Sequence, residues 1–148
     1  MTPTSSAGYS GTPLAQKLGI KEGHRVAVLR APKGLAGLVG RMPAGARLIF
    51  GPRSPGPYDL VILFVADRAA LSAALPRARR LLDPYGGLWV SWPKKTSALY
   101  RDLTENHVRA AGLAAGVVDN KVCAVDEVWS GLRLVVRTAD RPPKGKPS

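Results

Sequence analysis

The chain has 148 residues, one cysteine and a formal net charge of +12. A chain of this length builds one domain around its own hydrophobic core and needs neither disulfides nor a structural metal. Its longest apolar run, Leu60–Ala66, is far too short to cross a bilayer, and its first residues lack the basic cluster and apolar core of a secretory signal. We therefore expect a soluble, cytoplasmic protein with no membrane partner.

The positive charge lies on the body of the chain as well as in its tail. Removing residues 137–148 takes away two arginines, two lysines and one aspartate, which still leaves +9 on the rest. A field of that sign attracts nucleic acid, acidic proteins or phosphorylated small molecules without choosing among them. The same charge also arises from a compositional bias toward Arg, Ala, Gly and Pro, so it either serves an anionic partner or is an ordinary solvated surface.

The first third of the chain predicts two short elements after a polar start. Residues 1–11 are small and polar, and we expect them to be disordered. Thr12 as N-cap, Pro13 at the first helical position and Gly19 beyond the end bracket a short helix. An apolar strand is predicted at Arg25–Leu29, and the Gly- and Pro-rich stretch that follows it allows only a weak helix.

Two further strands and a long helix follow. The strands are predicted at Arg47–Phe50 and Leu60–Val65, with the loop GPRSPGP between them. Because the apolar run of the second of these strands is continuous, it indicates burial on both faces and a parallel sheet. Asp67 then caps a helix that continues to about Leu82, and Pro76 should kink or divide that helix.

The last part of the chain predicts a strand, a helix and a hairpin. After the turn DPYGG we expect a strand at Leu88–Trp92. A helix is predicted at about Thr104–Ala114, and Asp102 and Glu105 at its start have a capping-box spacing. The two apolar runs on either side of DEVWSG predict a final antiparallel hairpin.

Together these elements predict a single Rossmann-like three-layer α/β domain over residues 12–137. Its sheet should be mostly parallel with a C-terminal antiparallel hairpin, and residues 138–148 should form a disordered basic tail. This order of elements resembles the class I S-adenosylmethionine-dependent methyltransferase fold. In particular, YDLVILFV at 58–65 and YGGLWVSW at 85–92 resemble that fold's fourth and fifth strands.

Several separated motifs resemble a narrower family. They are GYSGTPLAQKLGI, GGLWVSWPKKTS, DLT and GLAAGVVDNKVCAVDEVWSGLRLV. In this order, over Gly8 to Arg137, they are similar to a small bacterial family catalogued as domain of unknown function 3052. That family is defined by sequence alone, so the resemblance implies no activity for this chain.

The resemblance to methyltransferases lacks the motif that binds their cofactor. Where the first strand ends, a methyltransferase would have an acidic residue and a Gly-rich loop, and this chain has Arg30 to Gly34, with Arg30 and Lys33 better suited to phosphate than to a sulfonium. After the second strand there is no carboxylate for a ribose. Arg53 at that place either meets a 2′-phosphate, as in some NADP enzymes, or is an ordinary loop arginine. We therefore predict no cofactor.

Other familiar chemistries are not supported. His24 and His107 have no neighbouring ligands that would indicate a metal. The adjacent carboxylates Asp126 and Glu127 would point to opposite faces of a strand, so a hairpin turn explains them better than an acid–base pair. Cys123 lies in an apolar run and is interpreted as a small buried hydrophobe. A nucleophile elbow and a phosphate-binding P-loop are both missing from the sequence.

The candidate site follows from geometry, because ligands of open α/β sheets bind beyond the carboxyl ends of the parallel strands. The rim residues so predicted are Lys33, Asp67, Pro93, Lys94 and Lys95. Lys94 and Lys95 are the strongest, since they follow a proline just beyond a strand end. The alternative is a solvated loop in which these lysines pair with Asp119 or Glu127.

The hairpin supplies the remaining candidates, Asp119, Trp129 and Arg133. Trp129 and Arg133 either stack on each other and close a pocket, or Trp129 only covers the edge of the sheet.

Three functional hypotheses remain open. The preferred one is a non-catalytic binding or regulatory module that takes an anionic ligand or a protein partner on a basic rim. The second is an enzyme or sensor for a nucleotide-like or S-adenosyl ligand, held by Lys33, Lys94 and Lys95. The third is a nucleic-acid-associated protein that uses the RARR segment, Arg77 to Arg80, and the basic tail as contacts. The sequence leaves the oligomeric state open.

Overall fold

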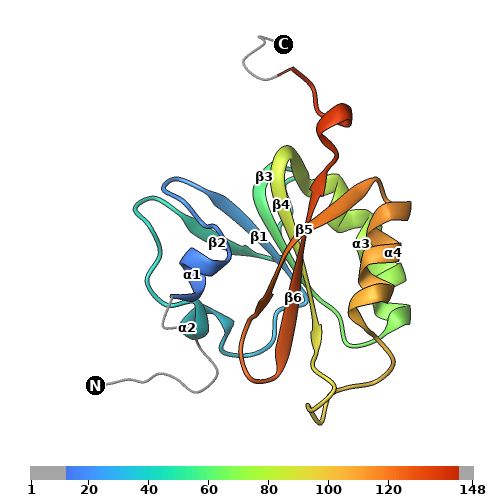
Figure 1. The fold of residues 1–148 in the computed structure, drawn as a ribbon. Helices are drawn as coiled ribbons and strands as arrows, with labels where there is room; N and C mark the ends of the chain where they lie inside the picture. The colour runs from blue at the N-terminus through green and yellow to red at the C-terminus, as the bar shows by residue number, and fades with distance from the viewer. Residues whose placement is uncertain (1–12, 144–148) are drawn as a thin grey trace.

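The centre of the molecule is a six-stranded sheet in the order β2-β1-β3-β4-β6-β5 (Figure 1). The computed structural model describes residues 13–143. The strands are β1 (Arg25–Leu29), β2 (Arg47–Phe50), β3 (Tyr58–Phe64), β4 (Leu82–Pro93), β5 (Val117–Ala124) and β6 (Trp129–Val136). The first four run parallel, β6 is antiparallel to β4, and β5 is antiparallel to β6. The predicted Rossmann-like fold with a C-terminal hairpin is therefore confirmed.

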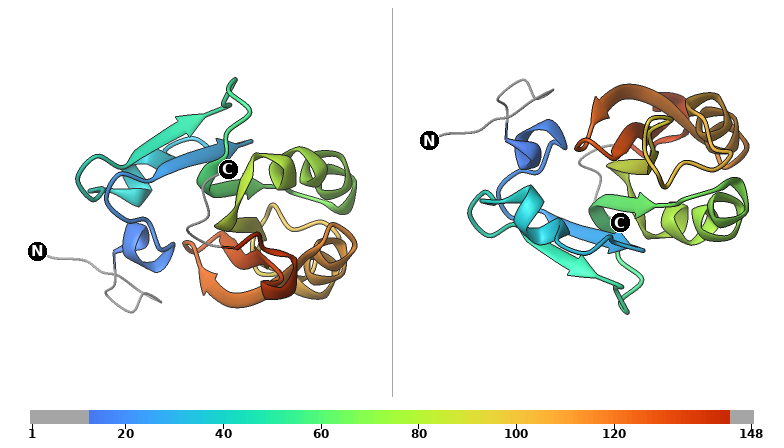
Figure 2. Two further views of the ribbon diagram at one scale, coloured as in Figure 1. Left: turned by 90° about the horizontal axis from the view of Figure 1, so that it is seen from above. Right: turned by 90° about the horizontal axis from the view of Figure 1, so that it is seen from below.

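Helices cover both faces of this sheet (Figure 2). One face carries α3 (Arg68–Leu81) and α4 (Glu105–Ala114) side by side, and the other carries α1 (Leu14–Lys17) and α2 (Leu35–Val39). A 3-10 turn, η1 (Thr138–Asp140), follows the last strand. The helices on the first face are long and those on the second are a single turn or little more, so helices cover much less of the second face.

Apolar side chains on each face of the central strands form two cores. On the α3 and α4 side, Leu63, Leu88 and Leu134 are completely buried. On the other side, Trp89 is completely buried and its indole N–H donates to the Leu18 carbonyl at 2.8 Å. The continuous apolar runs of β3 and β4 contribute buried side chains to both cores. These two strands therefore lie in the middle of the sheet.

The connection from β2 to β3 is short for two parallel strands that are not neighbours. Residues 51–57 leave β2, cross β1 and enter β3 on its other side. Such a crossover normally takes about a dozen residues or more and usually contains a helix. Here it is a coil, so in the described part of the chain no second helix lies beside α3 over β1 and β2 (Figure 2).

The predicted turn DPYGG is wrong, because its residues belong to β4. Tyr58 pairs with Leu82 and Leu60 pairs with Gly87, so the residues between them on β4 bulge opposite Asp59 alone. Gly86 permits this close approach, since a Cβ there would lie 2.4 Å from the Asp59 carbonyl oxygen. Pairing with β3 has overridden the local turn chemistry.

The start of α4 also differs from the prediction. Its N-cap is Thr104, which forms a capping box with His107 in place of Asp102 and Glu105. Asp102 instead accepts the backbone N–H of Arg68 at 3.0 Å, on the first residue of α3. The carboxylate therefore caps a helix that begins 34 residues earlier in the chain.

The ends of the other helices refine the prediction. Pro13 is the N-cap of α1, whereas the sequence predicted it as the first helical residue, and α3 runs through Pro76 without dividing.

In the predicted disordered tail, η1 forms and Arg141 donates from its Nε to the Val136 carbonyl at 2.9 Å. The predicted disorder of residues 1–11, the Thr12 cap and the last residues of the tail, 144–148, lie outside the described residues. None of the helices within 13–143 has the length and apolar character needed to cross a membrane.

Candidate functional site

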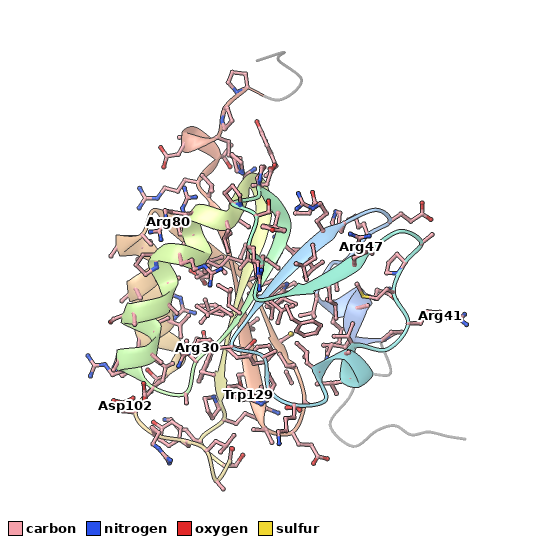
Figure 3. The ribbon with its side chains drawn as sticks, turned by 180° about the vertical axis from the view of Figure 1, so that it is seen from behind. Arg30, Arg41, Arg47, Arg80, Asp102 and Trp129 are labelled. Atoms are coloured by element: carbon pink, nitrogen blue, oxygen red, sulfur yellow. The ribbon has the colours of Figure 1, made fainter. Side chains whose placement is uncertain are left out.

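The carboxyl ends of the parallel strands meet along one edge of the sheet, which we call the rim. Arg30 follows β1, Gly51 follows β2, and Lys94 follows β4. Figure 3 shows Arg30, Trp129 and Asp102 toward this edge, and Arg47 and Arg80 toward the opposite one. Two pockets open at the rim, both on the face that carries α3 and α4.

The first pocket contains the two lysines that the sequence favours, and we call it the lysine pocket. Its volume is about 460 Å³, and it lies between the end of β4, the start of β6 and the start of α4. Lys94 is half-buried and Lys95 is exposed. The lining residues are Trp92, Lys94, Lys95, Leu103, Thr104, Glu105, Asn106 and Ser130. Thr104, Asn106 and Ser130 add polar atoms that the sequence alone did not single out.

The first turn of α4 faces this pocket. Thr104 and His107 satisfy each other's backbone N–H groups in the capping box, while the positive end of the helix dipole remains at the pocket. Glu105 is the one carboxylate in the lining, and it pairs with Arg109 four residues along the helix. Arg109 also pairs with Asp119, so one guanidinium serves two carboxylates and Glu105 keeps negative charge at this side of the pocket.

The second pocket lies on the other side of α3, and we call it the arginine pocket. Its volume is about 280 Å³ and its lining is Leu29, Arg30, Gly51, Ala73, Ala74 and Arg77. Arg77 donates from Nη2 to the Pro52 carbonyl at 2.7 Å. The pocket occupies the place where the short β2–β3 connection leaves the sheet without a second covering helix. No carboxylate lines it.

Asp67, a predicted rim residue, is engaged in the fold. It is the N-cap of α3, and its Oδ1 accepts the Ala70 N–H at 2.8 Å. It lines neither of the two rim pockets. A cap satisfies a helix N–H that would otherwise be unpaired, so this geometry assigns Asp67 a structural role. Lys33 is exposed in the loop before α2 and lines neither pocket.

Asp119 does not lie on the rim. It pairs with Leu134, which pairs with Leu88, so it lies near the opposite end of the sheet, roughly 20 Å along the strands from Lys94. Its Oδ2 accepts from Arg109 Nε at 3.2 Å. The hydrogen bond to Glu105, and secondarily the one to Asp119, raises the pKa of Arg109. The alternative in which the rim lysines pair with Asp119 is therefore wrong, and within residues 13–143 neither lysine forms an ion pair with Glu127.

Trp129 and Arg133 lie on one face of β6 without stacking on each other. Trp129 packs edge-to-face on Phe64, with ring centroids 5.1 Å apart. The Arg133 guanidinium lies over Gly87, where a Cβ would be 2.5 Å from its Nε. Burial, and secondarily the charge of Arg141, lowers the pKa of Arg133. Trp129 thus covers the rim end of the sheet, and Arg133 lies toward the opposite end.

Other titratable groups have local roles. His24 accepts the Lys21 N–H on its Nδ1 at 3.1 Å, and His107 belongs to the α4 capping box. Asp126 accepts the N–H groups of Val128 and Trp129, both at 2.8 Å, which makes it a turn residue as expected. Burial raises the pKa of the Cys123 thiol. Within residues 13–143 no three His, Cys, Asp or Glu side chains are placed to hold a metal ion.

The chain is similar in structure to S-adenosylmethionine-dependent methyltransferases at low sequence identity. One from Aquifex aeolicus is 15% identical over 82% of this chain and 87% of its own, with a TM-score of 0.56. A TehB-like one from Corynebacterium glutamicum is 11% identical over 88% and 91%, with a TM-score of 0.54. Magnesium protoporphyrin IX methyltransferase from Synechocystis, with bound S-adenosylmethionine, is 13% identical over 84% and 74%, also at 0.54. No family model and no curated protein matches the sequence.

These likenesses show the fold, and the rim residues do not fit its cofactor. A ribose at the end of β2 would lie beside Phe50, Gly51 and Pro52. None of these residues has a carboxylate that could accept hydrogen bonds from the ribose hydroxyl groups. After β1, Pro32 lacks an N–H and Arg30 adds positive charge where a sulfonium would lie. The residues present suit an anion better than an S-adenosyl group.

Proposed function

We propose that the protein is a non-catalytic binding module of methyltransferase-like fold, which takes the anionic part of a small phosphorylated molecule in the lysine pocket. The proposal keeps the fold and the rim of the methyltransferases and replaces their cofactor by a negatively charged ligand. Lys94 and Lys95 would supply the charge, and Thr104, Asn106 and Ser130 the hydrogen bonds.

The observation that carries this proposal is how the chain uses its acidic side chains. Five aspartates accept backbone N–H groups, namely Asp59, Asp67, Asp83, Asp102 and Asp126. Glu105 and Asp119 are paired with Arg109. Lys94 and Lys95 form no ion pair within residues 13–143. These carboxylates keep their charge, but none of them forms an ion pair with Lys94 or Lys95 within residues 13–143, so both ammonium groups remain open to an anionic ligand.

The chemistry of the pocket favours a phosphate over a carboxylate of similar size. Lys94, Lys95 and the first turn of α4 line one space, and a phosphate group offers more charge and more acceptor oxygens to them than a carboxylate does. A volume of about 460 Å³ lies within the range of small-molecule sites. The pocket therefore suits a phosphorylated molecule of modest size.

The test is an amide chemical-shift map of the labelled protein with ATP, S-adenosylhomocysteine and a short DNA duplex added separately. We expect ATP to give saturable shifts at Lys94, Lys95, Thr104 and Asn106. Lys94→Ala should weaken ATP binding about tenfold, as expected for loss of a charge-assisted hydrogen bond. Lys21→Ala, which removes an exposed lysine on the α1 side, is the matched control and should change little.

Three outcomes would contradict the proposal. Saturable shifts with S-adenosylhomocysteine at Arg30 to Gly34, together with methyl transfer from S-adenosylmethionine, would make the protein an enzyme. Diffuse shifts with DNA that fade steeply with salt would favour the nucleic-acid hypothesis. Equal losses from Lys94→Ala and Lys21→Ala would mean that ATP senses only the general field of the protein.

A further inference from the structure

The arginine pocket is independent of the lysine pocket and exists because of the short β2–β3 connection. A crossover helix at this place would lie beside α3 and cover the ends of β1 and β2. The coil 51–57 leaves this region to Arg30, Gly51 and Arg77. Figure 3 places Arg30 beyond the end of β1, beside α3.

The backbone at Arg30 is held in an uncommon conformation. Its φ is +61°, and within residues 13–143 it is the one residue other than glycine with a positive φ. A side chain beyond the Cβ makes this left-handed conformation unfavourable, so glycine would suit the position better. Backbone strain of this kind concentrates at functional sites, where it positions a side chain that the site requires.

The opposite wall positions the second arginine. Arg77 is exposed on α3, and its hydrogen bond to the Pro52 carbonyl holds the guanidinium across the pocket at the cost of one N–H donor. A guanidinium has five such donors, so others remain for a ligand. Neither Arg30 nor Arg77 forms an ion pair within residues 13–143.

We propose that Arg30 and Arg77 form a second binding site, for the tetrahedral oxyanion of a small phosphate monoester. Two planar guanidinium forks match the oxygens of a phosphate, which two ammonium groups would not do with the same directionality. The volume of about 280 Å³ limits the ligand to a small one. Leu29, Ala73 and Ala74 provide short apolar walls for the carbon part of the ester.

Inorganic phosphate and methyl phosphate are the probes. Each is titrated into labelled protein while the amides of Arg30, Gly51, Ala73 and Ala74 are followed. We expect saturable shifts at these amides. Arg30→Gly should weaken the binding of both probes by about 10- to 100-fold, the loss expected for hydrogen bonds to a charged group. Since glycine suits the positive φ, this variant should melt at the same temperature as the unchanged protein or higher, so that lost binding is not lost folding.

Matched variants separate a built site from general charge. Arg30→Lys keeps the charge and loses the fork, and we expect an intermediate affinity. Arg77→Gln should weaken phosphate binding, whereas Arg80→Gln, with the same charge change one turn further along α3, should not. Equal losses of phosphate binding from Arg77→Gln and Arg80→Gln would overturn the site. It would also be overturned if phosphate shifted the amides of the lysine pocket instead and these shifts disappeared in Lys94→Ala.

Discussion

The two sides of the sheet are built very differently. The half formed by β4, β6 and β5 is covered on one face by α3 and α4, of 14 and 10 residues. On the opposite face of this half, Trp89 is completely buried and donates to Leu18, which follows α1. The half formed by β1 and β2 lacks a long helix within residues 13–143, because the β2–β3 connection is a coil and α2, which follows β1, has only 5 residues. Phe50, at the end of β2, is 51% exposed.

This difference separates stability from access. The long helices α3 and α4 bury apolar side chains of β3, β4, β6 and β5, so this half should provide more of the free energy of unfolding than β1 and β2 do. The β1 and β2 side has a short edge strand and thin cover, so it should open locally at lower free energy. The arginine pocket also lies on this thinly covered side. The missing crossover helix therefore exposes two guanidinium groups while most apolar side chains of the core stay buried.

The largest expected effect comes from aromatic residues on the two sides. Trp89→Ala should lower the free energy of unfolding by about 3–5 kcal/mol, because it empties a buried site and removes the hydrogen bond to Leu18. Phe50→Ala, which truncates a half-exposed ring, should stay within about 0.5 kcal/mol. Urea unfolding followed by circular dichroism measures both. Similar losses for the two variants would mean that the β2 side contributes to stability as much as the β4 side does.

A smaller effect is expected at the start of α3, between the two sides. Asp67→Ala should lower the free energy of unfolding by about 1 kcal/mol, because the Ala70 N–H loses its acceptor. Asp67→Ser keeps an acceptor oxygen and should lose less. Neither variant should change phosphate or ATP binding if Asp67 is only a cap. A loss of binding in Asp67→Ser, with stability kept, would return Asp67 to the ligand site.

The fold was predictable from the sequence because its signals are local and strong. The apolar runs of β1, β3 and β4 mark buried parallel strands, and Asp67 is a recognisable cap. The predictions that were wrong concern features that depend on contacts with distant parts of the chain. Whether Asp102 caps its own helix or α3 is decided by a contact 34 residues away. Whether DPYGG turns or extends is decided by pairing with β3.

The candidate site was predictable only as an edge of the sheet. Strand order places Lys94 at the rim, since it follows a parallel strand directly. It does not show that Asp119 lies at the other end, because that depends on the register of β5 against β6. Nor does it bring Arg30 together with Arg77, which share a pocket only because α3 passes the end of β1. The residues of the rim that were missed, Thr104 and Ser130, carry no motif beyond the helix cap.

The smallest effect tests whether the thin side of the sheet stores strain at Arg30. Arg30→Gly should raise the free energy of unfolding by about 0.5–1 kcal/mol, because glycine adopts the left-handed conformation without steric cost. The greater flexibility of glycine in the unfolded chain offsets part of this stabilisation. Gly34→Ala, in the same loop at φ +80°, should lower it by a similar amount. Opposite signs at two neighbouring positions are difficult to produce by any general change in the loop. If both variants are destabilised, the Arg30 side chain holds the fold together, and its place in the arginine pocket needs no ligand to explain it.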